Sequence, residues 1–194
     1  NADSDAFTVA RAIKMKFPEI HCVVLTPFSH GITRRMERED LSIFDYVFCW
    51  LGNTNLILSI IKLIEDKMNI EHDVHEAGVQ MILLVEDSVR FYSSILPNLY
   101  GYILQQSRNF ATEAPTLRMR GRPKVMLART YEEAMQLYER YKDNCLGVIS
   151  DVRFPMHGAR DSEAGFKLLE DIRKQDEYVP LIMESSETAN KYRA

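Results

Sequence analysis

The alternation of short apolar runs with helical patterns constrains the fold of this chain more than any other feature. The runs are almost continuously apolar, and the segments between them repeat apolar residues at helical spacing. Strands that are apolar on both sides are typical of a parallel sheet with helices packed on each face. The pattern therefore predicts an α/β fold. The expected strands are residues 20–26, 44–52, 81–85, 125–130, 145–151 and 179–186, and the expected helices are residues 5–17, 55–69, 88–105, 130–141 and 163–175.

Size and composition narrow the class of protein further. The chain has 194 residues, of which 46% are hydrophobic, so it can build one large domain or two small ones. Its formal net charge of -4 offers no basic field to nucleic acid, and its apolar runs are too short to cross a membrane. The three cysteines lack metal-ligand spacing, and no signal peptide is visible. We therefore expect reduced, buried thiols and a cytoplasmic location.

An internal repeat divides the chain. Residues 6–26 align without a gap onto residues 165–185, at an offset of 159. Identity is low, but helix phase, strand position and a hydroxyl at the strand end agree. The aligned pairs include Phe7 with Phe166, Ile13 with Ile172, Val23 with Ile182 and Thr26 with Ser185.

The repeat predicts two domains that are cut at different places. Residues 3–70 would be the C-terminal part of the first domain, and residues 71–79 a polar linker. Residues 80–194 would form most of a second domain that stops after its fourth strand. The chain is then expected to be a fragment of a longer protein.

Acidic and hydroxyl groups stand where strands of the second half end. Glu86 and Asp87 follow its first strand, Asp151 ends its third and Ser185 its fourth. In parallel α/β sheets, ligands bind outside the carboxyl ends of the strands. Carboxylates crowded there repel one another and favour a divalent cation with oxygen ligands, most naturally Mg²⁺. A carboxylate beside such a cation can attack a phosphoryl donor and form an acyl phosphate.

Three motifs, taken in order, resemble the receiver domain of bacterial response regulators, the phosphorelay component of two-component signal transduction. "ILLVEDS" looks like the first strand of that family with its acidic pair, "GVISDVRFP" like the third strand and phosphoacceptor loop, and "VPLIMESSE" like the fourth strand with its Ser/Thr switch. The resemblance implies a flavodoxin-like, doubly wound parallel sheet of five strands in the order 2-1-3-4-5. One partial and one nearly complete copy would be present.

The same resemblance assigns roles to residues of this chain. Asp151 would be the phosphoacceptor, and Glu86, Asp87, Asp151 and the main-chain carbonyl of Arg153 would hold Mg²⁺. Ser185 would be the switch hydroxyl, and Thr26 its equivalent in the first copy. The implied partners are a histidine kinase or phosphotransfer protein, an output module and a second copy of the chain in a homodimer.

Two departures from the family pattern limit this interpretation. The family has a lysine at the end of its fifth strand, but the second copy stops before that strand, and the first copy has Cys49 or Trp50 at the position. The segment 105–124 lengthens the span from Asp87 to Asp151 by roughly twenty residues over the usual family spacing, and it is rich in arginine.

A second resemblance covers the stretches "SVRFYSSILPNLYGYILQQSRNFATEA" and "RMRGRPKVMLARTYEEA". They look like the receiver region of large multidomain proteins described as phosphoenolpyruvate synthases. No phosphate-cradling glycine loop and no evident catalytic histidine is present in this sequence, so we expect a regulatory module rather than an enzyme. At most it would catalyse its own phosphorylation and dephosphorylation.

Other interpretations stay open at this point. Glu86 and Asp87 could simply mark where a strand meets water, Asp151 could cap a helix or a turn, and Ser185 could cap the last helix. The receiver could be a scaffold or dimerisation module that is never phosphorylated and regulates a fused enzyme. A hydrolase with the same metal crevice is a third hypothesis. Finally, the strands of the first half could complete the sheet of the second, within or between chains.

Overall fold

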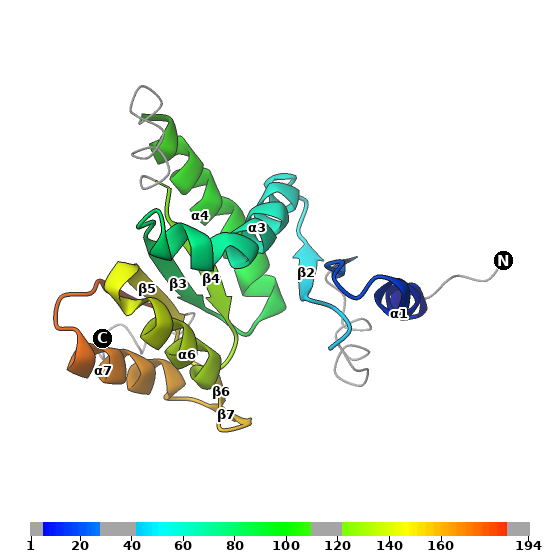
Figure 1. Cartoon of the computed structure of the whole chain (residues 1–194). Coiled ribbons are helices and arrows are strands. Elements are labelled where there is room, and N and C mark those ends of the chain that lie inside the picture. The colour runs from blue at the N-terminus through cyan, green and yellow to red at the C-terminus, as the bar shows by residue number, and fades with distance from the viewer. Residues whose placement is uncertain (1–5, 28–41, 110–121, 186–194) are drawn as a thin grey trace.

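The computed structural model describes residues 6–27, 42–109 and 122–185 (Figure 1). The first half of the chain contains α1 (Ala6–Lys16), β1 (Val23–Pro27), β2 (Tyr46–Trp50) and α3 (Asn55–His75). The second half contains β3 (Met81–Val85), α4 (Val89–Asn109), β4 (Lys124–Ala128), α6 (Tyr131–Tyr141), the short 3-10 helix η1 (Lys142–Asn144), β5 (Cys145–Asp151), β6 (Phe154–Met156), β7 (Ala159–Asp161), α7 (Ala164–Gln175) and β8 (Leu181–Glu184). None of the helices within these described ranges is long and apolar enough to cross a membrane.

The second half is built on a four-stranded parallel sheet in the order β4-β3-β5-β8. Numbered along this half of the chain, that order is 2-1-3-4. Because neighbouring parallel strands need a crossover, helices connect them, as the alternating sequence pattern predicts. The predicted α/β class with a parallel sheet is confirmed.

Helices cover both faces of this sheet, and the strand residues alternate between them. Leu83 and Val85 of β3 pack with α6 and α7 on one face. Leu84, between them, packs with α3 and α4 on the other face. Figure 1 shows the sheet lying between these two pairs of helices. The continuous apolar run of β3 is therefore explained by burial on both sides.

The helix and strand predicted to repeat are present in both halves. An offset of 159 places α1 on α7 and the start of β1 on that of β8, each within one residue. In the first half, α1 packs through Phe7, whose ring meets that of Phe44 edge to face at 5.2 Å between centroids.

Strand β1 pairs in parallel with β2, and these strands form their own two-stranded sheet. Within the described residues, neither of them joins the four-stranded sheet. The hypothesis that the first half completes the sheet of the second within one chain is therefore wrong. The other edge of β2 faces α4, which already supplies polar groups to it.

Side chains of α4 satisfy backbone groups along that edge. The Cys49 amide donates a hydrogen bond of 2.9 Å to the hydroxyl of Ser93, and the Tyr92 hydroxyl donates one to the carbonyl of Val47. Cys49 is buried, as expected of a packing residue, whereas Trp50 is 38% exposed. A strand edge that could have accepted another strand is thereby bonded to a helix of the second half.

Helix α3 ends at His75, six residues later than the predicted end at residue 69, and so takes up residues 71–75 of the predicted linker. Ile70 and Val74, one turn apart, are both buried and continue the apolar face of the helix. The polar residues between them hide this continuation in the sequence. Most of the arginine-rich stretch at 105–124 lies outside the described residues.

A buried carboxylate on α3 joins the halves. Asp66 is fully buried and accepts hydrogen bonds from the Tyr100 hydroxyl at 2.8 Å and from the Val125 amide at 3.0 Å. The Lys124 ammonium, itself only 6% exposed, lies 3.4 Å from the other oxygen of Asp66 and 2.6 Å from Asp73. Buried polar groups persist only when they are paired, so α3, α4 and β4 are fixed to one another here.

Replacing Asp66 by Leu should therefore destabilise the protein. The Tyr100 hydroxyl and the Val125 amide would lose their acceptor inside the core, and the free energy of unfolding should fall by about 3 kcal/mol. Urea denaturation measures the change. The control is Glu65→Gln at the neighbouring, more exposed position, which should cost less than about 1 kcal/mol. Equal losses for the two variants would contradict the role given to Asp66.

Candidate functional site

The pairing of the central strands brings the acidic residues together. Val85 of β3 lies opposite Ser150 of β5, so the residues that follow β3 meet the end of β5. Asp151, the last residue of β5, lies opposite Glu184 at the end of β8. Because all these strands are parallel, their polar ends converge at one edge of the sheet.

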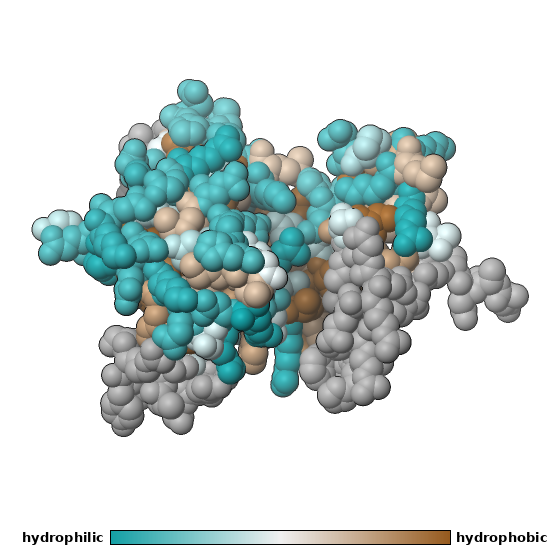
Figure 2. Space-filling view, turned by 90° about the horizontal axis from the view of Figure 1, so that it is seen from below, coloured by the Kyte–Doolittle hydropathy of each residue, from teal (hydrophilic) through white to brown (hydrophobic). Residues whose placement is uncertain are grey.

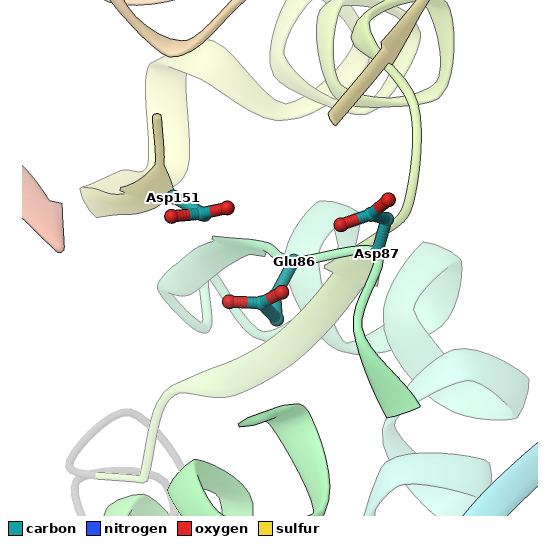
Figure 3. Close-up of side chains that lie close together, drawn as sticks. All are labelled: Glu86, Asp87 and Asp151. Atoms are coloured by element: carbon teal, nitrogen blue, oxygen red, sulfur yellow. The ribbon is translucent and has the colours of Figure 1, made fainter. Parts of the chain in front are cut away.

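Glu86, Asp87 and Asp151 form a compact carboxylate group at this edge, which we call the acidic triad. One oxygen from each lies within 4.8 Å of the others. Figure 3 shows the carboxylates of Asp87 and Asp151 directed toward one another, with that of Glu86 beside them. The structure thus brings together the three side chains predicted to bind a cation.

Burial and mutual repulsion disfavour the charged forms of the carboxyl groups in the acidic triad. Glu86 is only 3% exposed. Burial raises its pKa to about 7, and the neighbouring charges of Asp151, Asp87 and Glu184 add to the effect, while the Ser88 amide opposes it by donating a hydrogen bond of 2.9 Å. Burial also raises the pKa of Asp87, and the nearby Arg160 counters this. The site therefore favours any occupant that supplies positive charge.

A cavity of about 200 Å³ opens beside the acidic triad. Ser185 lies on its wall, so the predicted switch hydroxyl shares the cavity with the predicted phosphoacceptor Asp151. Residues of three strand ends and the segments after them, of the first turn of α4 and of the β6–β7 hairpin line it: Glu86, Ser88, Phe91, Asp151, Arg153, Arg160, Glu184 and Ser185. Thr26 belongs to the other sheet, where its hydroxyl donates a hydrogen bond of 3.2 Å to the Pro27 carbonyl.

Sequence reasoning missed the hairpin that closes over this edge. β6 and β7 are antiparallel, and the turn between them carries positive φ at both His157 (54°) and Gly158 (80°). Two central residues of positive φ are typical of the tight hairpin turn that follows the twist of the strands. The dipeptide His-Gly was the one available signal, and strands of three residues are too short to show a period.

The hairpin delivers Arg160 to the acidic triad. Its guanidinium lies 3.5 Å from a carboxylate oxygen of Asp87 and 3.4 Å from the main-chain carbonyl of Arg153. The amide of Arg153 faces the Asp151 carboxylate at 3.3 Å. The carbonyl predicted to bind a cation is thus near the acidic triad and accepts a bond from Arg160 in this structure.

Gly165 holds the other side of Asp151. It is the second residue of α7, and its amide donates a hydrogen bond of 2.9 Å to the Val152 carbonyl. A Cβ atom at this position would lie 2.2 Å from the Asp151 carbonyl oxygen, closer than atoms can approach. Only glycine allows α7 to pack this closely against the strand end that bears Asp151.

The donor set fits a hard divalent cation. Three carboxylates and a main-chain carbonyl are oxygen ligands of the kind that Mg²⁺ and Ca²⁺ take, and no sulfur or imidazole is among the residues lining the cavity. The ligand types alone do not separate these two cations.

Comparison with known protein families, with curated proteins and with solved structures gave no match.

The raised pKa of Glu86 gives a pH-dependent prediction for the metal-free protein. The folded state binds this proton more tightly than the unfolded chain, whose carboxyl has the ordinary value of 4.5, so stability should fall as the pH rises from about 4.5 through about 7. Glu86→Gln cannot lose a proton, and its amide oxygen can still accept from Ser88. Relative to the wild type it should gain about 2 kcal/mol between pH 4.5 and pH 8, allowing for solvent screening at the cavity.

Urea denaturation of both proteins across this pH range, with a chelator present, measures the difference. Added Mg²⁺ should shrink it by compensating the charge of the wild type. A stability difference that does not change with pH would contradict the electrostatic account of Glu86.

The close approach at Gly165 gives a second prediction. Gly165→Ala should lower the free energy of unfolding by about 2 kcal/mol or more, because the backbone of α7 must move away from Asp151. Gly101→Ala is the matched control, since Gly101 is exposed within α4 and a Cβ there has open space. That control should be stabilised by about 0.5–1 kcal/mol through helix propensity. Chemical denaturation measures the free energy of unfolding of the two variants. A change in the same direction for both would contradict the packing argument.

Proposed function

We propose that this chain carries a receiver module of a phosphorelay, in which Asp151 accepts a phosphoryl group with the help of Mg²⁺. The observation that supports it most directly is the meeting of the acidic triad and Ser185 at one cavity, at the carboxyl ends of adjacent parallel strands. The proposed fold of the complete module is the doubly wound sheet of five strands, order 2-1-3-4-5, of which the four-stranded sheet described above would form the first four positions.

The chemistry assigns distinct tasks to the residues of the site. A carboxylate oxygen of Asp151 attacks the phosphorus of a phosphodonor, forming an O–P bond while the bond from phosphorus to the leaving group breaks. Glu86, Asp87, Asp151 and the Arg153 carbonyl would hold the cation, which offsets the charge of the transferring group when it is bound. The hydroxyl of Ser185 would donate a hydrogen bond to the bound phosphoryl group.

The proposed signal is a change in the surface around the cavity. A phosphoryl group on Asp151 replaces the single carboxylate charge by about two negative charges and adds new acceptor oxygens within the cavity that Ser185 also lines. A partner that binds the phosphorylated and unphosphorylated surfaces differently would read this change. The proposed phosphoryl sources are a histidine kinase or phosphotransfer protein, and the proposed output is a fused or associated enzyme such as a phosphoenolpyruvate synthase.

A scaffold role for the first half is the second candidate. Strand β2 corresponds to the strand that carries the lysine in receivers, and it ends in the buried Cys49 and the half-exposed Trp50. Its edge is bonded to Tyr92 and Ser93 of α4 rather than left free. These contacts favour a first half that positions the second and is not itself phosphorylated.

The proposed function predicts phosphorylation by a small phosphodonor. With Mg²⁺ and acetyl phosphate, the chain should gain the mass of one phosphoryl group, and Asp151→Asn should abolish the gain. Asp143→Asn should keep it, because Asp143 is exposed in η1, at the end of β5 opposite to Asp151. Intact mass spectrometry reads the outcome. A wild type that gains no phosphoryl group, or an Asp151→Asn variant that gains as much, would overturn the phosphoacceptor assignment and leave the scaffold role for both halves.

A further inference from the structure

Arg160 faces two of the groups that would ligate a cation. Its guanidinium lies 3.5 Å from Asp87 and 3.4 Å from the main-chain carbonyl of Arg153, and both groups belong to the proposed ligand set of the metal. Arginine has donors but no acceptor, so its contacts place a positive charge directly on groups that would also ligate a metal. A divalent cation bound to the same groups would be repelled by the guanidinium.

The hairpin holds Arg160 in this place from outside the sheet. The His157 amide at its turn donates a hydrogen bond of 2.7 Å to Glu132 on α6. Asp161, the residue after Arg160, forms an ion pair of 2.6 Å with Lys167 on α7 and accepts a bond of 2.7 Å from the Glu163 amide. The hairpin is therefore anchored on both neighbouring helices, and these anchors do not depend on the acidic triad.

The contact made by Arg160 can nevertheless be broken at low cost. Its side chain is 64% exposed, in contrast to the 17% of its partner Asp87. Exposed ion pairs contribute little, and solvent can take over the guanidinium when it leaves. Asp87, by contrast, is largely buried beside the carboxylates of Glu86 and Asp151, so it still requires a nearby positive charge.

We propose that Arg160 is the built-in counter-ion of the acidic triad, and that it competes with the divalent cation for Asp87 and the Arg153 carbonyl. In the metal-free protein the guanidinium supplies the positive charge, and metal binding requires it to turn out toward solvent. Arg160 therefore sets how much Mg²⁺ is needed to load the site. This inference rests on the proposed function for the presence of the cation, but not on phosphorylation of Asp151.

Titration calorimetry with Mg²⁺ alone tests the competition at fixed ionic strength, since salt screens exposed charges. Arg160→Gln should bind Mg²⁺ about three- to tenfold more tightly than the wild type, because the competitor is removed. The same variant should melt at a lower temperature when a chelator is present, because the acidic triad has then lost its counter-ion. These opposite changes separate competition from a merely structural role, which would weaken both properties.

Two further variants sharpen the test. Lys174→Gln removes an exposed cation of α7 that pairs with Asp171 and touches neither the hairpin nor the acidic triad, so it should leave Mg²⁺ affinity within about twofold. Arg160→Lys keeps the charge but loses the planar fork, and its affinity should lie between those of the wild type and Arg160→Gln.

The outcomes distinguish this inference from the proposed function. If the wild type and Arg160→Gln bind Mg²⁺ equally well, or if Lys174→Gln tightens binding as much as Arg160→Gln, the competition is overturned while phosphorylation of Asp151 can still be observed. If neither protein binds Mg²⁺, both the competition and the cation site are overturned. Tighter binding by Arg160→Gln alone supports the inference even where Asp151 accepts no phosphoryl group.

Discussion

The parallel pairing of β3 with both of its neighbours is the constraint on which the rest of the second half depends. A strand between two parallel partners cannot be joined to either by a tight turn, so each connection crosses over a face of the sheet. The crossovers bury both faces, and all the strand ends then point to one edge. Glu86, Asp87 and Asp151 meet there because of backbone register, not because of any attraction between like charges.

Helix α4 connects this edge to the first half of the chain. It begins at Val89, two residues after Asp87, and its first two turns place Tyr92 and Ser93 against the edge of β2. Further along, Tyr100 bonds the buried Asp66 of α3. Figure 2, a view from below, shows hydrophilic residues over most of the four-stranded half and hydrophobic ones near its junction with the first half. Helix α4 thus begins beside the candidate site and also contacts the first half through Tyr92, Ser93 and Tyr100.

The sequence predicts those features of the fold and of the site that depend on the local apolar pattern and on the residues at strand ends. Apolar runs and helical spacing identify the main strands and helices, and the polar residue at each strand end then identifies Glu86, Asp87 and Asp151, since parallel strands must end together. What could not be predicted depends on contacts between distant segments. The late end of α3 follows from burial of Ile70 and Val74, and the bonds from α4 to β2 join side chains to a strand edge more than forty residues away. The hairpin that carries Arg160 has strands too short for any period to show.

The three ways of neutralising the site are alternatives to one another. Burial leaves the acidic triad with more negative charge than its surroundings can solvate, and a proton on Glu86, the guanidinium of Arg160 or a divalent cation can each compensate it. A divalent cation would contact all three carboxylates at once, whereas a proton on Glu86 neutralises one and the guanidinium reaches Asp87 alone among them. In the metal-free site, a proton on Glu86 and the guanidinium of Arg160 each compensate only part of the negative charge. Binding of a metal would release both, so metal affinity should depend on pH through Glu86 and on the hairpin through Arg160, although neither residue lies on the strand that bears Asp151.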